Sequence, residues 1–283
     1  MRYAYIKDKF VDKDQPIISV EERGFRFGDG VFETIRIHDG ILYQWELHLE
    51  RLESGLEALK IPFDTEPLHA LSAELIYMNN IPDGILRLSI SRGIGSKGYL
   101  PTASITPTLV IETIEILGLP RGAVSCWTSQ VEKISPRALP VNNKLMQGMN
   151  SILARMEAQE HECFDALQCN AAGEIVETSS GNIFWVKDNI LHTPSLSCGA
   201  VAGTTRAAII RLSPLKVKEG RFPLAELEKA EAVFITNVSW GAQPVGSLQP
   251  QGWQWNSLEA VRPYRTLLQD DIEAYVNAHA AVE

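Results

Sequence analysis

Residues 173–184 read Gly173-Glu174-Ile175-Val176-Glu177-Thr178-Ser179-Ser180-Gly181-Asn182-Ile183-Phe184 and are the most informative stretch of the sequence for the fold. Within it, Glu177 is flanked by small polar residues and stands just before an apolar run. A carboxylate in such a place can be the buried partner of a cationic ring nitrogen, or it can be an ordinary turn residue. The pattern predicts a strand from Ile175 to Val186 that is interrupted between Thr178 and Asn182.

Outward from this stretch, helix and strand patterns alternate along the chain, which predicts a mixed α/β (α+β) fold. The segment 117–122 contains Pro120 and two glycines and breaks both periods, so it predicts a linker between an N-terminal domain, 1–116, and a C-terminal domain, 123–283. The other predicted strands are Tyr3 to Val11, Gly30 to His38, Ile41 to Tyr43, Ile85 to Arg92, Thr108 to Ile116, Ala123 to Val131, Phe164 to Asn170 and Ala232 to Thr236. The predicted helices are Trp45 to Leu59, Leu68 to Met78, Lys144 to about Gln159, Thr204 to Leu212 and Ser257 to Ala278.

Composition excludes several classes of function. The 283 residues carry a net charge of −9 and no basic run, which argues against nucleic-acid binding but not against a small anionic ligand. No apolar stretch approaches the roughly 20 residues that cross a bilayer, and the N-terminus lacks the apolar core of a signal peptide. The four cysteines show no metal-binding spacing, so we expect reduced thiols, no metal and a cytoplasmic protein.

Three further features can carry chemistry. Lys144 follows two asparagines at the start of a predicted helix; such a lysine is solvated unless it is buried, where it can lose its proton and act as a nucleophile. The run Gly203-Thr204-Thr205-Arg206 begins another helix and is either an anion site or an ordinary N-cap. Arg51 lies three residues after His48, as a surface ion-pairing residue or as an anion ligand.

Taken in order along nearly the whole chain, these features resemble the fold-type-IV pyridoxal 5′-phosphate (PLP) enzymes, the class IV aminotransferases. That group includes branched-chain aminotransferases, D-amino-acid transaminases and aminodeoxychorismate lyases. The resemblance rests on the segments Phe27 to Thr34, His48 to Leu52, Lys144 to Arg155, Glu177 to Phe184, Gly203 to Arg206, and Phe234 to Asn237 leading to Pro244-Val245.

The resemblance implies a set of roles. Lys144 is similar to the lysine that holds the cofactor as a Schiff base, Glu177 to the carboxylate on the pyridine nitrogen, and Arg51 to the phosphate arginine. The Gly203-Thr204-Thr205 turn and the Asn237-Val238 turn resemble a backbone phosphate cradle. One departure follows Lys144, where this chain has Gln147 and many relatives have Asn.

Two segments bear on the substrate. Alternation along a strand places Phe32, Thr34 and Arg36 on one face, and this pattern resembles the lyases. The run Ser91-Arg92-Gly93-Ile94-Gly95-Ser96-Lys97-Gly98-Tyr99 is similar to a lyase loop, with Lys97 in place of a second arginine. We therefore expect Phe32, Thr34, Arg36, Lys97 and Tyr99 near the substrate, with Arg36 and Lys97 on its carboxylates.

The resemblance implies a two-domain enzyme with the cofactor between its domains and a homodimer whose pocket borrows residues from the neighbour. Its leading reaction is 4-amino-4-deoxychorismate cleavage to 4-aminobenzoate and pyruvate, with Lys144 as the proton carrier. The alternative is an aminotransferase acting on a D-amino acid or a branched-chain amino acid. A third hypothesis is a PLP-binding protein without catalysis, which the combination of Lys144, Glu177 and Arg51 disfavours.

Overall fold

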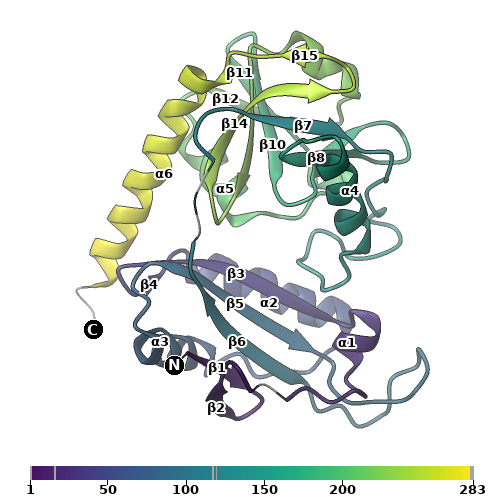
Figure 1. Cartoon of the computed structure of the whole chain (residues 1–283), viewed down its shortest axis with the longest axis vertical. Helices are drawn as coiled ribbons and strands as arrows, with labels where there is room; N and C mark the ends of the chain where they lie inside the picture. Colours follow the sequence, from purple (N-terminus) through teal and green to yellow (C-terminus); the bar gives the residue numbers. More distant parts are fainter. Residues whose placement is uncertain (1, 16, 117, 119, 281–283) are drawn as a thin grey trace. The chain divides into compact units, whose positions relative to one another are not determined.

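The computed structural model describes residues 2–15, 17–116, 118 and 120–280, and the chain divides into two units (Figure 1). The first unit comprises Met1–Leu117, Asn143–Gln147 and Ile272–Glu283, and the second comprises Gly118–Asn142 and Gly148–Asp271. The predicted linker, 117–122, includes positions 117 and 119, which lie outside the described residues.

The first unit is built on a six-stranded antiparallel sheet of order β2-β1-β6-β5-β3-β4. Its strands are β1 (Tyr3–Ile6), β2 (Lys9–Asp12), β3 (Gly30–His38), β4 (Ile41–Leu42), β5 (Gly84–Ser91) and β6 (Thr108–Ile114). The prediction of one strand from Tyr3 to Val11 was wrong. Lys7 adopts a left-handed φ of 62°, so the chain turns there and forms a hairpin.

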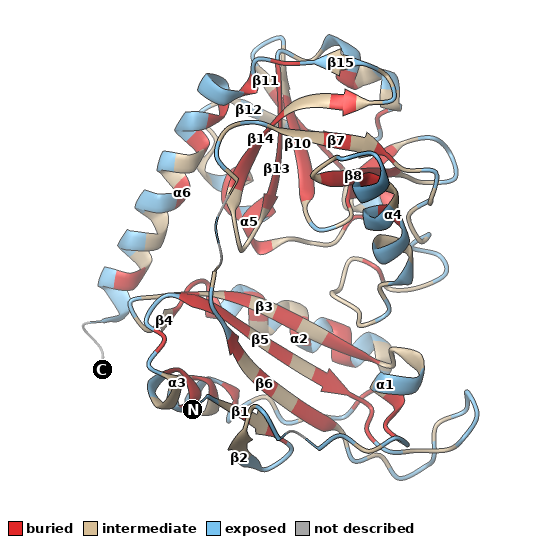
Figure 2. Ribbon diagram, viewed as in Figure 1, coloured by how far each residue is buried: buried red, intermediate tan, exposed pale blue. Residues whose placement is uncertain are grey.

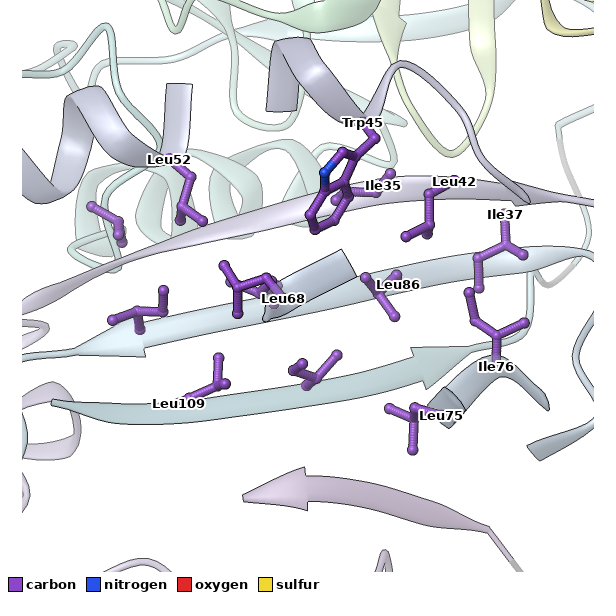
Figure 3. Packing of buried hydrophobic residues seen from close by; sticks show 14 of the residues in the cluster. Ile35, Ile37, Leu42, Trp45, Leu52, Leu68, Leu75, Ile76, Leu86 and Leu109 are labelled. Carbon is purple, nitrogen blue, oxygen red and sulfur yellow. The ribbon is translucent and has the colours of Figure 1, made fainter. Parts of the chain in front are cut away.

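Two helices cover the apolar face of this sheet, α2 (Trp45–Leu59) and α3 (Leu68–Asn79), and a short α1 (Arg23–Phe27) precedes β3. Figure 3 shows the core between the layers, where Leu52 of α2 and Leu68 and Leu75 of α3 pack over strand residues such as Ile35 and Leu86. Each such buried side chain contributes about 1.5–3 kcal/mol through removal from water. The core therefore fixes which face of β3 is buried and which is open.

The second unit contains a nine-stranded mixed sheet in which β12-β11-β10-β13-β14-β7-β8-β9 follow one another and β15 pairs with β14. Its strands are β7 (Val124–Thr128), β8 (Asp165–Cys169), β9 (Ile175–Thr178), β10 (Asn182–Lys187), β11 (Ile190–Pro194), β12 (Lys216–Gly220), β13 (Ala232–Asn237), β14 (Gly241–Gln249) and β15 (Trp253–Gln254). Its helices are α4 (Met149–Glu160), η1 (Leu196–Cys198), α5 (Thr204–Leu212) and η2 (Leu224–Lys229), and α6 (Ser257–His279) begins here and ends in the first unit.

The segment around Lys144 is not helical, which corrects the prediction that a helix begins there. Helix α4 begins at Met149. Residues 144–146 instead run antiparallel to the start of β3, because the Phe32 N–H donates to the Lys144 carbonyl at 2.9 Å and the Met146 N–H donates to the Gly30 carbonyl at 2.9 Å. Lys144 was expected in the C-terminal domain; this backbone pairing makes it part of the first unit.

Candidate active site

Lys144 lies against the open face of β3. Its Nζ lies 4.0 Å from the centroid of the Phe32 ring, at a distance that allows a cation–π interaction between the ammonium group and the ring. The side chain is half-buried rather than fully solvated. The backbone pairing of residues 144–146 with β3 fixes the Lys144 backbone beside the strand and so limits where its amine can reach.

The open face of β3 carries the residues that the sequence predicts to share it. Along this strand Val31, Ile35 and Ile37 are buried in the core, while Phe32, Thr34 and Arg36 are half-buried on the other side, and Figure 2 shows the alternation. Burial lowers the pKa of Arg36, and its Nε is buried with no hydrogen-bond partner among the described residues. A buried N–H group of this kind can donate a hydrogen bond to an anionic ligand.

Arg87 joins this face, although the sequence analysis did not single it out. It lies directly opposite Thr34 on β5, and its guanidinium stands 4.4 Å from the Phe32 ring centroid. A signal was present, because Leu86, Leu88 and Ile90 alternate with Arg87 along the strand. The open face therefore groups an aromatic ring with three cationic side chains, those of Lys144, Arg36 and Arg87.

On the opposite face, Glu33 organises a buried charge cluster. Its carboxylate accepts hydrogen bonds from Arg51 Nε at 2.7 Å and Arg51 Nη2 at 2.6 Å, and it lies 2.7 Å from His48 Nδ1. The Arg51 side chain is only 8% exposed, so Arg51 is not a surface ion-pairing residue. Glu33 thus fixes the orientation of the predicted phosphate arginine.

The electrostatics of this cluster follow from its burial. Burial alone raises the pKa of Glu33, but the charge of Arg51 and the hydrogen bonds from His48 and Arg51 outweigh it and lower that pKa to about 2. Burial lowers the pKa of His48, which is neutral at pH 7. An ionised carboxylate can only accept, so His48 Nδ1 carries its hydrogen toward Glu33.

In the second unit, Glu177 is a buried residue of β9. Its Oε2 accepts hydrogen bonds from Asn182 Nδ2 at 2.9 Å and from the Val201 N–H at 3.0 Å, while Lys133 Nζ lies 2.7 Å from Oε1. The strand interruption predicted between Thr178 and Asn182 is present as a turn between β9 and β10. Glu177 is therefore a held, buried carboxylate and not a solvated turn residue.

The turn that leads into α5 lies beside this carboxylate. The N-cap of α5 is Gly203, which has no side chain to accept a hydrogen bond from the first turn. A Cβ on Gly203 would lie 2.1 Å from Asn182 Oδ1, so only glycine fits here. Thr204 and Thr205 are buried at the positive end of the helix dipole, an arrangement suited to an anion. Arg206 instead donates to the Pro194 carbonyl and pairs with Glu219.

The second predicted phosphate turn follows β13. Asn237 Oδ1 accepts hydrogen bonds from the Ser239 and Trp240 N–H groups, and Asn237 Nδ2 donates to the Ser180 carbonyl. The Asn237 side chain therefore shapes the turn that carries Val238 and ties it to the β9–β10 turn. What remains for binding at this position is the backbone of the turn.

The predicted substrate residues Lys97 and Tyr99 lie elsewhere, on an exposed loop. Tyr99 is 88% exposed, and Lys97 is exposed as well. Arg23 holds this loop, because its guanidinium donates to the Gly98 and Tyr99 carbonyls at 2.8 and 2.9 Å while its Nε pairs with Asp29. None of the contacts found among the described residues brings Lys97 or Tyr99 onto the face of β3.

Other site classes find less support. Within the described ranges, no cluster of three or more His, Cys, Asp or Glu side chains could hold a metal ion. The four cysteines are free. No helix in the described part of the chain is long and apolar enough to span a bilayer.

Comparisons with known proteins identify the family. The profile of the family described as Amino-transferase class IV matches residues 30–248. A Methanocaldococcus jannaschii protein named "Putative branched-chain-amino-acid aminotransferase" is 31% identical over 249 residues, 85% of this chain and 86% of that protein. The aminodeoxychorismate lyase of Vibrio harveyi is 30% identical over 244 residues, 83% of this chain and 88% of that protein. The crystal structure of the 4-amino-4-deoxychorismate lyase of Pseudomonas aeruginosa superposes with a TM-score of 0.83 at 27% identity, over 95% of this chain and 99% of that one.

The chain belongs to the class IV aminotransferase family and is a PLP-dependent enzyme of that family. The expected mixed α and β architecture of a fold-type-IV enzyme and the expected cofactor are thereby confirmed. The residues present also fit the cofactor: Lys144 offers an amine, Glu177 a buried carboxylate, and Gly203 to Thr205 a helix N-terminus for a phosphate. The relatives carry different activities, so the reaction is a separate question.

Proposed function

We propose that this enzyme cleaves 4-amino-4-deoxychorismate to 4-aminobenzoate and pyruvate, a step of folate biosynthesis. The observation that carries the proposal is the open face of β3, which Phe32, Thr34 and Arg36 share and on which Lys144 lies over the Phe32 ring. Arg36 presents a buried donor with no partner among the described residues, which suits a substrate carboxylate. The relatives from Vibrio harveyi and Pseudomonas aeruginosa support the same reaction.

In this proposal the cofactor is held by Lys144 at its aldehyde, by Glu177 at its ring nitrogen, and by Arg51 and the two turns at its phosphate. The turns are those of Gly203-Thr204-Thr205 and Asn237-Val238. When bound, PLP supplies an electron sink that makes the substrate C4–H bond acidic. Glu177 supports that sink by holding the ring nitrogen in its protonated form, which requires an ionised carboxylate.

The amine of Lys144 performs the proton transfer. Its Nζ takes the proton from ring C4, the electron pair of the C4–H bond becomes a ring double bond, and the C3–O bond breaks. The three-carbon fragment departs as the enolate of pyruvate and takes up a proton, and the ring becomes aromatic. Because the nitrogen stays on the product, the reaction needs no amino acceptor.

The alternative is an aminotransferase acting on a branched-chain or D-amino acid, and the relative from Methanocaldococcus jannaschii favours it. There Lys144 would move a proton between the substrate Cα and the cofactor, and a keto acid would collect the nitrogen. Arg36 would then bind the carboxylate of an amino acid.

A side-by-side assay separates the two reactions. The purified enzyme is incubated with 4-amino-4-deoxychorismate alone, and in parallel with leucine or D-alanine alone. Pyruvate and 4-aminobenzoate formation without a keto acid supports the lyase. Conversion of the cofactor to its amine form by leucine or D-alanine, with no cleavage of the first substrate, would replace the lyase by the aminotransferase. A chain with neither reaction would be a PLP-binding protein without catalysis.

We also propose that the enzyme is cytoplasmic and forms a homodimer in which each subunit contributes residues to the pocket of its neighbour. Helix α4 supports this, because Met149, Ile152, Leu153 and Met156 are 45–57% exposed and recur at helical spacing along one face. An exposed apolar stripe is a common mark of a protein interface. The exposed loop with Lys97 and Tyr99 would then have a neighbouring pocket to reach.

A further inference from the structure

Lys133 forms a buried ion pair with the carboxylate that we propose for the cofactor ring nitrogen. Its Nζ lies 2.7 Å from Glu177 Oε1, and the two side chains are only 9% and 5% exposed. Lys133 lies in the loop after β7 and belongs to none of the motifs that identify the family in this sequence. It is therefore a charged residue at the site whose purpose the proposed reaction does not yet explain.

The backbone around Lys133 holds the amine in place. The Lys133 N–H donates to the Cys169 carbonyl at 2.9 Å, and Gln168 Nε2 donates to the Val131 carbonyl at 3.0 Å. Gln168 is fully buried and lies opposite Glu177 in the pairing of β8 with β9. The loop is thus tied to the strand next to Glu177, so the amine is not a surface group that reaches Glu177 by chance.

The hydrogen-bond donors around Glu177 contact different oxygens of its carboxylate. Asn182 Nδ2 and the Val201 N–H bond to Oε2 and are uncharged. Lys133 Nζ, which lies 2.7 Å from Oε1, adds a positive charge to these uncharged donors. A carboxylate has about four acceptor positions, so three donors leave room for one more, such as a ring N–H.

A buried ion pair is costly to desolvate, and an apolar pair of similar volume is often as stable. Stability alone therefore gives a poor reason for a lysine at this position. A ring-nitrogen partner, in contrast, must be charged and correctly aimed before the cofactor arrives. We propose that Lys133 is a positioning residue that pairs with Glu177 and fixes the orientation of its carboxylate for the cofactor ring, an inference that rests on the function proposed above.

The test measures binding of pyridoxamine 5′-phosphate to the apoenzyme by isothermal titration calorimetry, because this probe forms no bond to Lys144. Lys133→Gln should weaken binding by about tenfold or more, because it leaves the buried Glu177 carboxylate without its cationic partner. Lys133→Arg, which keeps the charge, should restore most of the affinity. Lys187→Gln is the matched control. Lys187 Nζ lies 2.8 Å from the Glu226 carboxylate and is not paired with Glu177, so this variant should leave binding unchanged.

Glu177→Gln separates this inference from the proposed function. If Glu177→Gln weakens binding and Lys133→Gln adds no further loss to it, the two residues act together as proposed. If Lys133→Gln binds like the wild type while Glu177→Gln is weak, the inference is wrong and the role of Glu177 stands. If Glu177→Gln itself binds like the wild type, the proposed contact with the ring nitrogen is wrong.

A folding failure is also informative. Should Lys133→Gln be recovered only in unfolded form, the double variant Lys133→Gln/Glu177→Gln removes both charges. Recovery of folded double variant, judged by circular dichroism, supports the pair as the cause. Failure of both variants to fold contradicts the inference, because the lysine would then be required by the fold independently of Glu177.

Discussion

Glu33 and His48 form a hydrogen bond of 2.7 Å in which both side chains are only 1% exposed. The pair joins β3, whose other face carries Phe32, to α2, which carries Arg51. The same strand therefore places a proposed substrate residue on one side and orients a proposed phosphate ligand on the other. A substitution at Glu33 should therefore change the positions of both Phe32 and Arg51.

This cluster predicts how the apoenzyme responds to acid. The pKa of His48 is lowered by burial, so the folded chain resists a proton that the unfolded chain accepts, and stability is lost as pH falls below about 6.5. The pKa of Glu33 is lowered to about 2, so its contribution is present above the unfolded value of 4.5 and disappears as pH falls toward 2. Both effects act in the same direction.

Urea titrations of the apoenzyme at a series of pH values measure this response. We expect the free energy of unfolding to fall by up to about 1.4 kcal/mol per pH unit below about pH 6.5 on account of His48, and by about 3 kcal/mol in all on account of Glu33. His48→Asn should flatten the upper part of the curve. A wild-type curve that rises from pH 6.5 to pH 4.5 would show that the cluster is described wrongly.

Gly203→Ala should disturb the site through Asn182. The added Cβ would lie 2.1 Å from Asn182 Oδ1, and Asn182 cannot easily move because its Nδ2 bonds to Glu177 and to the Val201 carbonyl. We expect a loss of at least about tenfold in cofactor affinity and a loss of about 1–3 kcal/mol in stability. Gly98→Ala is the control, since a Cβ there meets nothing within 4 Å. Equal behaviour of the two variants would contradict the steric account.

Arg36→Gln should act on the substrate and not on the cofactor. Loss of a charge-assisted contact to a carboxylate costs about 1.5–3 kcal/mol, which corresponds to a KM about 10–150 times higher. We expect kcat to change much less and the affinity for pyridoxamine 5′-phosphate to stay the same. Steady-state kinetics with the preferred substrate provides the measurement. An unchanged KM would remove Arg36 from the substrate site.

Ile152→Glu should convert the proposed dimer to a monomer. Ile152 is 54% exposed in the middle of the apolar stripe of α4, and a carboxylate there would have to be desolvated at an interface. Sedimentation velocity measures the assembly state. Leu258→Glu is the control, because Leu258 is similarly exposed at 43% but lies on α6, away from the stripe. A wild-type protein that sediments as a monomer would contradict the proposal at once.

Part of this site could be predicted from the sequence because its signals are local. Helices α2 and α5 begin and end at the predicted residues. Their signals, apolar periodicity and a glycine N-cap, depend only on residues that are close together in the sequence. The common face of Phe32, Thr34 and Arg36 follows from strand alternation alone. The strand interruption after Glu177 is visible for the same reason, as a run of small residues between apolar ones.

The rest depends on contacts between distant segments. The run after Lys144 has a helical apolar pattern, but residues 144–146 pair with β3, more than 100 positions earlier in the chain, and local propensity gives no sign of that. The same holds for Lys133, whose place beside Glu177 is set by hydrogen bonds to β8. Arg87 is different. Alternation along β5 predicts the face of the strand on which it lies, but not that it lies against Phe32.

Reduction of the holoenzyme with borohydride, followed by peptide mass spectrometry, addresses the central claim most directly, because it makes the bond between cofactor and lysine permanent. We predict that the phosphopyridoxyl group is found on Lys144 and that Lys144→Ala yields no labelled peptide and no aldimine absorbance. A label on Lys133 or on any other lysine of the wild-type protein would contradict the account.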